Sequence, residues 1–481
     1  MNRLLKNSIM ALAACVAISS AACADPWAHH VEQTYNISEI APYDSADSVL
    51  GKPTLLIEEP GDEHTSAGEF HCSLVYSAAW VGPNDTRLIA EIIGDGYITV
   101  RFDDPIYDDP DNWDQKDFIV FGNARFAGIG YISTDTNMES YTLKSDGEMG
   151  GEPMTVSVSQ DGVNWFNYDK PDDPHADDYA PTQSFAWDWV NHTWGPELDF
   201  TKPVPKNLTP NDFYARTAAQ AMDMYKDSGG GTSFDISGFD LPRDPVTGWK
   251  WIKYIKVTAN VPDVYDSFYK MEGEVDAFAR VGHTIKPIAA GLAKKLDNGT
   301  RVILNEGVVI AATYETGPFC YIEHDNRCSG IKVMGRVLPR NTKVVVYGIV
   351  DTVDGEKVIR ATALEDMGLV PKVAPVGMPN KSLGNAGLDN TGMLVRTWGK
   401  VKSVDNLAKS FMISDGSGVE VKCVAPRDIT NGINPRVDFT PPHQDQYVSV
   451  SGIVTCEDDG QGQLLPVVRL RDAGDLAKLT P

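Results

Sequence analysis

The chain is poor in cysteine and in positive charge, and both shortages exclude classes of function. Only 7 of its 481 residues are cysteine and no C-x-x-C pair occurs, which argues against a zinc ribbon. Lys and Arg number 42 against 67 Asp and Glu, so the net charge is −25 at pH 7. A chain this acidic repels polyphosphate, and we therefore expect no nucleic acid among its partners.

Transmembrane runs and catalytic motifs are also lacking. One apolar run near the N-terminus is too short to span a bilayer, and no later stretch is long and apolar enough, so no transmembrane segment is expected. Neither G-x-S-x-G nor H-E-x-x-H occurs in the sequence. The lack of a catalytic signature favours a binding protein over an enzyme.

The N-terminus has the layout of a secretory signal peptide. Two basic residues precede the apolar run over residues 9–18, and the small residues Ala22 and Ala24 follow it. We therefore expect cleavage after Ala24, removal of residues 1–24 and an extracytoplasmic location, secreted or at the cell surface. Lipid attachment at Cys23 and an ordinary buried helix are the alternatives.

The remainder of the chain divides into three blocks, and the last two carry an internal repeat. Residues 286–370 and 371–481 each alternate apolar and polar residues in a pattern that predicts three strands, a long connection and two more strands. Gly348 and Gly452 occupy the same place in their strands, where glycine lets a strand bend round a small barrel. This arrangement resembles the OB-fold and predicts two small OB-like β-barrels.

The first block, residues 25–285, is also predicted to be mainly β, with one helix. The helix follows Thr209, which can cap it, and Tyr214, Ala218, Met222 and Tyr225 line one face. The predicted strands begin at Tyr97, Asp117, Met154, Trp251 and Glu274.

Three pieces of this block resemble a group of bacterial cell-surface proteins that carry a galactose-binding-like, discoidin-like jelly roll. They are Val-Leu-Gly-Lys-Pro at 49–53, Val-Ser-Gln-Asp-Gly-Val-Asn-Trp at 158–165 and Glu-Val-Asp-Ala at 274–277. The chain departs from that pattern by an insertion at about 167–245, which carries the helix. The predicted fold class is mainly β: a jelly-roll β-sandwich with a helix-bearing insertion, then two OB-like β-barrels. The resemblance implies an extracellular, non-catalytic protein.

Two acidic groups make Ca²⁺ the candidate cofactor. Seven aspartates fall between positions 103 and 117, and a loop rich in carboxylates can curl round a hard cation. Asp108, Asp109 and Asp111 are its candidate ligands; a solvated acidic loop is the alternative. Glu274 and Asp276 lie two apart on a predicted strand and should face the same side. The jelly-roll resemblance implies a structural Ca²⁺ near the end of that strand.

The candidate ligand-binding residues are Trp187, Trp189 and Trp194. Exposed tryptophan faces stack on sugar rings, and Phe185, Trp187 and Trp189 at alternate positions would share one strand face. A small hydrophobic core for the insertion is the alternative, because tryptophan is usually buried.

The two barrels offer aromatic and basic residues that could contact nucleic acid. The net charge of −25 favours the alternative, in which the aromatics fill the barrel cores and the lysines form a solvated edge. The residues concerned are Phe319, Tyr321, Trp398, Lys400, Lys402 and Phe411.

Four cysteines are candidates for disulfides, which export would permit. Cys320 and Cys328 flank a predicted hairpin turn, and Cys423 and Cys456 end two strands of the last block. Cys72, the fifth cysteine of the mature chain, has no partner in this scheme. The alternative is that all five mature cysteines are small buried hydrophobic residues.

The expected function is therefore that of an exported, non-catalytic binding or surface-scaffold protein that contacts glycans or cell-envelope components. The alternative is a carbohydrate-active hydrolase that uses two of the many Asp and Glu residues as a catalytic pair.

Overall fold

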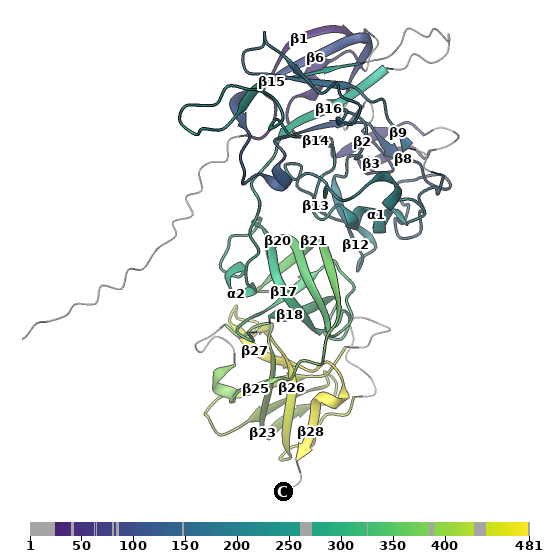
Figure 1. The fold of residues 1–481 in the computed structure, drawn as a ribbon. Coiled ribbons are helices and arrows are strands. Elements are labelled where there is room, and N and C mark those ends of the chain that lie inside the picture. The colour runs from purple at the N-terminus through teal and green to yellow at the C-terminus, as the bar shows by residue number, and fades with distance from the viewer. Residues whose placement is uncertain are drawn as a thin grey trace, which may run out of the picture.

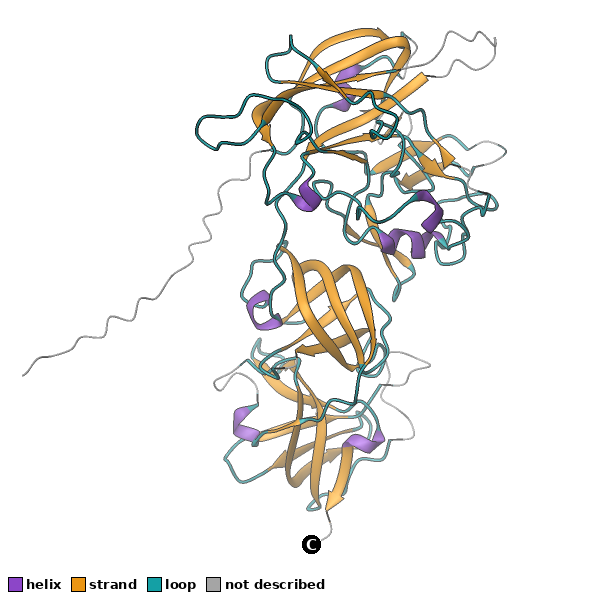
Figure 2. Ribbon diagram, viewed as in Figure 1, coloured by secondary structure: helices purple, strands orange, loops and turns teal. Residues whose placement is uncertain are grey.

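The computed structural model describes residues 25–479, apart from 40–42, 62, 64, 79–80, 83–85, 147–148, 260–271, 325, 384–388 and 428–438. The protein consists of three β-rich units that follow one another from top to bottom in Figure 1, and strands dominate all three (Figure 2). The mainly-β prediction is confirmed. Within the described residues, no helix has both the length and the apolar character needed to cross a bilayer.

The first unit is built on an eight-stranded antiparallel sheet. Its order is β11-β10-β15-β6-β16-β7-β14, and β1 pairs with the long strand β6 as well. The strands are β1 (His30–Ile37), β6 (Ala90–Tyr107), β7 (Phe118–Gly122), β10 (Thr155–Ser159), β11 (Phe166–Asn167), β14 (Thr232–Phe234), β15 (Trp251–Thr258) and β16 (Glu272–Arg280).

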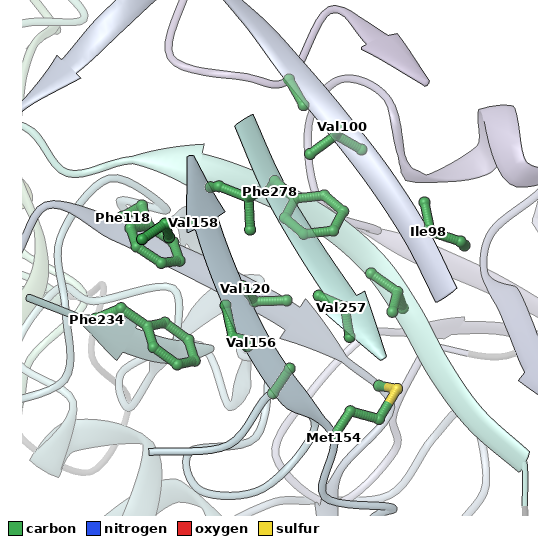
Figure 3. Packing of buried hydrophobic residues seen from close by; sticks show 14 of the residues in the cluster. Ile98, Val100, Phe118, Val120, Met154, Val156, Val158, Phe234, Val257 and Phe278 are labelled. Carbon is green, nitrogen blue, oxygen red and sulfur yellow. The ribbon is translucent and has the colours of Figure 1, made fainter. Parts of the chain in front are cut away.

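One face of this sheet buries the main hydrophobic core of the unit (Figure 3). Val156, Val257 and Phe278 point into it, and the rings of Phe118 and Phe234 stack with centroids 4.8 Å apart. Phe234 belongs to β14, within the segment predicted as an insertion. The end of that segment therefore returns to the main sheet and pairs with β7.

A second layer of short strand pairs, which we term the hairpin layer, lies beside this sheet, and strands β3, β8, β9, β12 and β13 contribute to its main core. Its strand pairs are β2 (Leu56–Glu59) with β3 (Gly68–His71), β4 (Val81–Gly82) with β5 (Thr86–Arg87), β8 (Arg125–Phe126) with β9 (Met149–Gly150), and β12 (Phe185–Asp188) with β13 (Thr193–Glu197). Single 3₁₀ turns lie at Ala46–Val49 and Trp113–Gln115.

The helix predicted after Thr209 is shorter than expected. Pro210–Asp212 form one 3₁₀ turn, Ala215 then adopts a φ of 59°, and the helix α1 covers only Ala218–Met224. Thr217 accepts a hydrogen bond from the Gln220 amide and donates its own amide to the Gln220 side chain. This capping box starts the helix at Thr217, because it satisfies amides that an uninterrupted helix would have bonded internally.

The second and third units are five-stranded barrels with the same topology, as the repeat predicted. The first barrel closes in the order β17-β18-β19-β21-β20, and the second in the equivalent order β23-β24-β25-β27-β26. The third and last strands of each barrel pair in parallel. The strands are β17 (Arg301–Ala311), β18 (Phe319–His324), β19 (Gly330–Met334), β20 (Thr342–Val353), β21 (Glu356–Leu369), β22 (Val376–Gly377), β23 (Leu394–Asp405), β24 (Ser410–Ser414), β25 (Glu420–Val424), β26 (Tyr447–Asp458), β27 (Leu464–Arg469) and β28 (Leu476–Leu479). The short helix α2 (Ala290–Ala293) precedes the first barrel, and 3₁₀ turns lie at Asn380–Ser382 and Ala473–Asp475.

Gly348 and Gly452 hold equivalent positions in the two barrels. A Cβ atom on Gly348 would lie 2.4 Å from the carbonyl oxygen of Arg360, and one on Gly452 would lie 2.5 Å from that of Arg469. These carbonyls belong to the last strand of each barrel, so a side chain at either glycine would push two paired strands apart.

The predicted disulfides are wrong, since all four cysteines are free thiols. Strand β27 lies between the strands that carry Cys423 and Cys456. Two strand spacings are about 9–10 Å, beyond the roughly 7 Å that a disulfide can bridge between Cα atoms. Cys320 lies near the start of β18, and Cys328 follows the end of that strand. The four residues that separate Cys320 from the strand end alone span about 13 Å.

The first unit and the first barrel are joined by ion pairs, and we term this contact the junction. Arg301 pairs with Asp227 at 2.9 Å and also donates to the carbonyls of Glu197 and Leu198. Arg336 pairs with Asp223 at 2.5 Å. Asp223 lies in α1 and Asp227 just after it, whereas both arginines belong to the first barrel. The junction therefore fixes the orientation of the barrel relative to the first unit.

The two barrels are joined in turn through Glu356. Its buried carboxylate accepts hydrogen bonds from the Tyr321 hydroxyl at 2.9 Å and the Cys456 amide at 3.0 Å, and it pairs with Lys332 at 2.7 Å. Groups from both barrels thus compensate the buried charge of Glu356, and its bond to the Cys456 amide connects β21 to β26.

We predict that Arg301→Met destabilises the protein by about 3 kcal/mol, because it leaves the buried Asp227 carboxylate without its main partner. Urea unfolding followed by tryptophan fluorescence measures the change. Lys343→Met is the control: its partner Glu306 is exposed, and the loss should stay below about 1 kcal/mol. Equal unfolding midpoints for the two variants would contradict the importance of the junction.

Candidate functional site

Most of the aromatic cluster predicted to bind sugar is instead core of the hairpin layer. Trp187 is 2% exposed, and its indole Nε1 donates to Glu139 at 2.8 Å. Trp189 is partly buried against the same core. The expectation that both tryptophans expose one strand face is wrong, because β12 ends at Asp188 and its pairing with β13 contains a register shift.

Trp194 also packs partly against this core, but in addition it lines a cleft at the junction. The cleft has a volume of about 260 Å³ and lies between the β12–β13 hairpin and strands β19 and β21 of the first barrel. Trp194 stacks on His71 with centroids 4.7 Å apart. The ring that lines the cleft is therefore held in place by a second aromatic ring.

Polar groups stand on both sides of this cleft. Asp188 belongs to the hairpin, and its carboxylate accepts hydrogen bonds from the Val190 and Asn191 amides at 2.9 Å. Arg360 comes from β21 and pairs with Asp351 at 2.5 Å. The Trp189 amide donates to the carbonyl of Gly335, which connects the hairpin turn to the barrel wall. The cleft thus combines one aromatic side chain with an acidic and a basic group.

A second candidate site is a cluster of three carboxylates in the first unit. Glu152, Asp177 and Glu274 each bring a carboxylate oxygen within 4.8 Å of the others. Asp177 is buried and accepts hydrogen bonds from the Ala124 and Glu152 amides. Gly122 makes room for it, since a Cβ there would lie 2.3 Å from Asp177 Oδ1.

Burial and mutual repulsion change the protonation of this cluster. Burial, then the neighbouring Glu152 and Asp177 carboxylates, raises the pKa of Glu274 to about 10. Burial also raises the pKa of Asp177 well above its usual range. The Glu274 oxygen Oε2 is buried and makes no hydrogen bond in the structure. Protons, or a cation in their place, are therefore needed to keep these groups together.

Asp276 does not join Glu274, and this part of the metal prediction is wrong. Its carboxylate instead accepts hydrogen bonds from the Thr54 amide at 3.0 Å and the Thr54 hydroxyl at 2.7 Å. The pairing of β16 with β7 contains one extra residue between Val275 and Ala277. This bulge breaks the alternation on which the prediction depended.

The acidic loop also differs from its prediction. Asp108 groups with Asp117 and Asp235, whereas Asp109 accepts a hydrogen bond from the amide of Asp111 and contacts His283. Asp111 is exposed. Among the described residues, only Asp108 of the three predicted ligands lies in a carboxylate cluster. Burial raises the pKa of its partner Asp117 to about 7.

A cavity of about 350 Å³ opens beside Glu274. Glu59, Tyr43, Asn123 and Arg125 also line it. Burial and the nearby Glu91, Glu274 and Glu59 raise the pKa of Tyr43 to about 12. Sequence reasoning found Glu274 but missed Glu59, Glu152 and Asp177, which come from distant segments that no local spacing connects.

Comparison with known proteins yields little. No family model matches the chain, and no curated protein matches it. A crystal structure of the p204 HINb domain aligns with 36% of this chain and 94% of its own chain, at 14% identity and a TM-score of 0.19. A likeness this weak says nothing about the function of this chain.

The carboxylate cluster predicts a pH dependence of stability. The folded protein keeps a proton on Glu274 up to a pKa of about 10, whereas the unfolded chain releases it near the ordinary value of 4.5. The free energy of unfolding should therefore fall as pH rises from about 5 to 9, by on the order of 1 kcal/mol per pH unit from this group.

Glu274→Gln should flatten that slope, and urea unfolding at several pH values measures it. The exposed Glu420→Gln is the control and should leave the slope unchanged. A wild-type stability that rises over the same range, or an identical slope in Glu274→Gln, would contradict the assignment.

Proposed function

We propose that the protein is an exported, non-catalytic binding or surface-scaffold protein that contacts glycans of the cell envelope through the junction cleft. The observation that supports this most is the position of Trp194, which lines the cleft together with Asp188 and Arg360. A pyranose ring presents a C–H-rich face that matches an indole ring, and its hydroxyls pair with charged side chains at the rim.

We also propose that Ca²⁺ is a structural cofactor at the cluster of Glu152, Asp177 and Glu274. Carboxylate oxygens are the ligands that Ca²⁺ prefers, and a divalent cation relieves the repulsion among the buried Asp177 and the half-buried Glu152 and Glu274. The bound cation would hold β16 against the segments that carry Glu152 and Asp177.

Trp194→Ala should weaken glycan binding roughly 3- to 10-fold, the range expected for one aromatic stacking contact. Pull-down and titration of residues 25–481 against a panel of neutral polysaccharides measure the change. Trp249→Ala is the control, since Trp249 is partly exposed in a loop and packs on Tyr107, far from the cleft residues in sequence. Equal losses in both variants, or no loss in Trp194→Ala, would contradict the cleft as the binding site.

The alternative is a carbohydrate-active hydrolase, and the cavity beside Glu274 favours it specifically. Glu59 and Glu274 line the same cavity, and the raised pKa of Glu274 keeps its carboxyl protonated, as a general acid has to be before it donates a proton. Reducing ends released during the same incubations decide between the two. Turnover that Glu59→Gln or Glu274→Gln abolishes supports the hydrolase, and binding without turnover supports the scaffold.

Millimolar Ca²⁺ should raise the melting temperature by several degrees more than NaCl of matched ionic strength, because a ligand that binds only the folded state stabilises it. Glu274→Gln should remove most of that rise. Asp111→Asn, which alters an exposed acid outside the cluster, should keep it. Equal effects of Ca²⁺ and NaCl on the wild-type chain would contradict a specific site.

A further inference from the structure

The outer face of the second barrel presents an aromatic and basic surface, separate from the junction cleft. Strands β23, β26 and β28 lie side by side at the end of the molecule opposite the first unit (Figure 1). Their outward side chains form what we term the distal face, which consists of Arg396, Trp398, Lys400, Lys402, Tyr447 and Leu479.

The large apolar side chains of the distal face are about half exposed. Trp398 is 45% exposed, Tyr447 54% and Leu479 45%. The pairing register places Lys400 opposite Tyr447, and Tyr447 opposite Leu479, so these residues form one continuous surface. Strand neighbours such as Val401 and Val448 are fully buried, as the alternation of a half-buried strand requires.

The surroundings of Trp398 leave room for a ligand. Its partner across the pair of strands is Ser449, and the next residue in that row, on β28, is Ala477. Both are small. Tyr447 lies diagonally beside Trp398, at a spacing that places two aromatic side chains within reach of adjacent rings of one polymer.

The charge of the distal face is opposite to that of the protein. Arg396, Lys400 and Lys402 contribute three positive charges, and the acidic Asp445 pairs with Lys400 at 2.8 Å. Fields are screened within about 8 Å at physiological ionic strength, so a ligand at this face responds to its local cations rather than to the net charge of −25.

We propose that the distal face binds an acidic polysaccharide. Trp398 and Tyr447 stack on the sugar rings, and the three cations pair with the carboxylates carried along the polymer. Nucleic acid is less suitable, because OB-folds usually bind it on the second and third strands. In this barrel those strands are β24 and β25, and Phe411 of β24 is buried in the core instead of offering a platform.

The test is titration of residues 25–481 with alginate, a polyuronate, alongside neutral pullulan and oligothymidylate. Alginate should bind with an affinity that falls as NaCl rises, and pullulan should not compete for this face. Trp398→Ala should weaken alginate binding roughly 3- to 10-fold. Lys400→Ala with Lys402→Ala should weaken it further and flatten its salt dependence.

Two controls separate this site from other surfaces. Leu407→Ala changes a residue that is exposed in a turn of the same barrel, outside the distal face, and should leave alginate binding unchanged. Trp249→Ala should also leave it unchanged, because Trp249 lies in the first unit and packs on Tyr107, outside both proposed binding surfaces. The proposal is overturned if alginate does not bind, if Trp398→Ala binds it like the wild-type chain, or if oligothymidylate displaces it at lower concentration.

Discussion

The pairing of buried charges at the junction is the interaction on which the rest of the architecture depends. Arg301 and Arg336 of the first barrel meet Asp227 and Asp223 of the segment round α1. Separation of the units would leave Asp227 and Arg336 without their partners. Because the desolvation of buried charges largely offsets their attraction, the pairs add little net stability and mainly specify one orientation of the two units. The junction cleft exists only in that orientation, since Trp194 and Arg360 come from opposite sides of it.

A second constraint follows from the excess of Asp and Glu over Lys and Arg. The chain places Glu152, Asp177 and Glu274 together inside the first unit, where burial and the neighbouring carboxylates raise the pKa of Asp177 and of Glu274. Such a cluster persists only with protons or a cation among its oxygens. The distal face shows the opposite arrangement, in which cations gather locally on an acidic protein. Net charge therefore describes the average surface and not its sites.

The barrels could be predicted from the sequence because their signals are local. Period-two alternation defines each strand, and Gly348 and Gly452 mark equivalent close approaches between strands. The predictions that failed relied on local sequence rules, and the tertiary structure overrode those rules. A bulge at Asp276 turned it toward Thr54, and strand β27 separated two cysteines that both end strands. The partners of Glu274 come from distant segments, so no spacing in the sequence connects them.

We propose that a glycan binds in the junction cleft, between the first unit and the first barrel. Hydrogen–deuterium exchange of residues 25–481, with and without a polysaccharide that binds, is the decisive measurement. The account predicts slower exchange in both walls of the cleft together, in β13 (Thr193–Glu197) and in the part of β21 (Glu356–Leu369) round Arg360. Protection in only one wall, or only in segments outside the cleft, would contradict it.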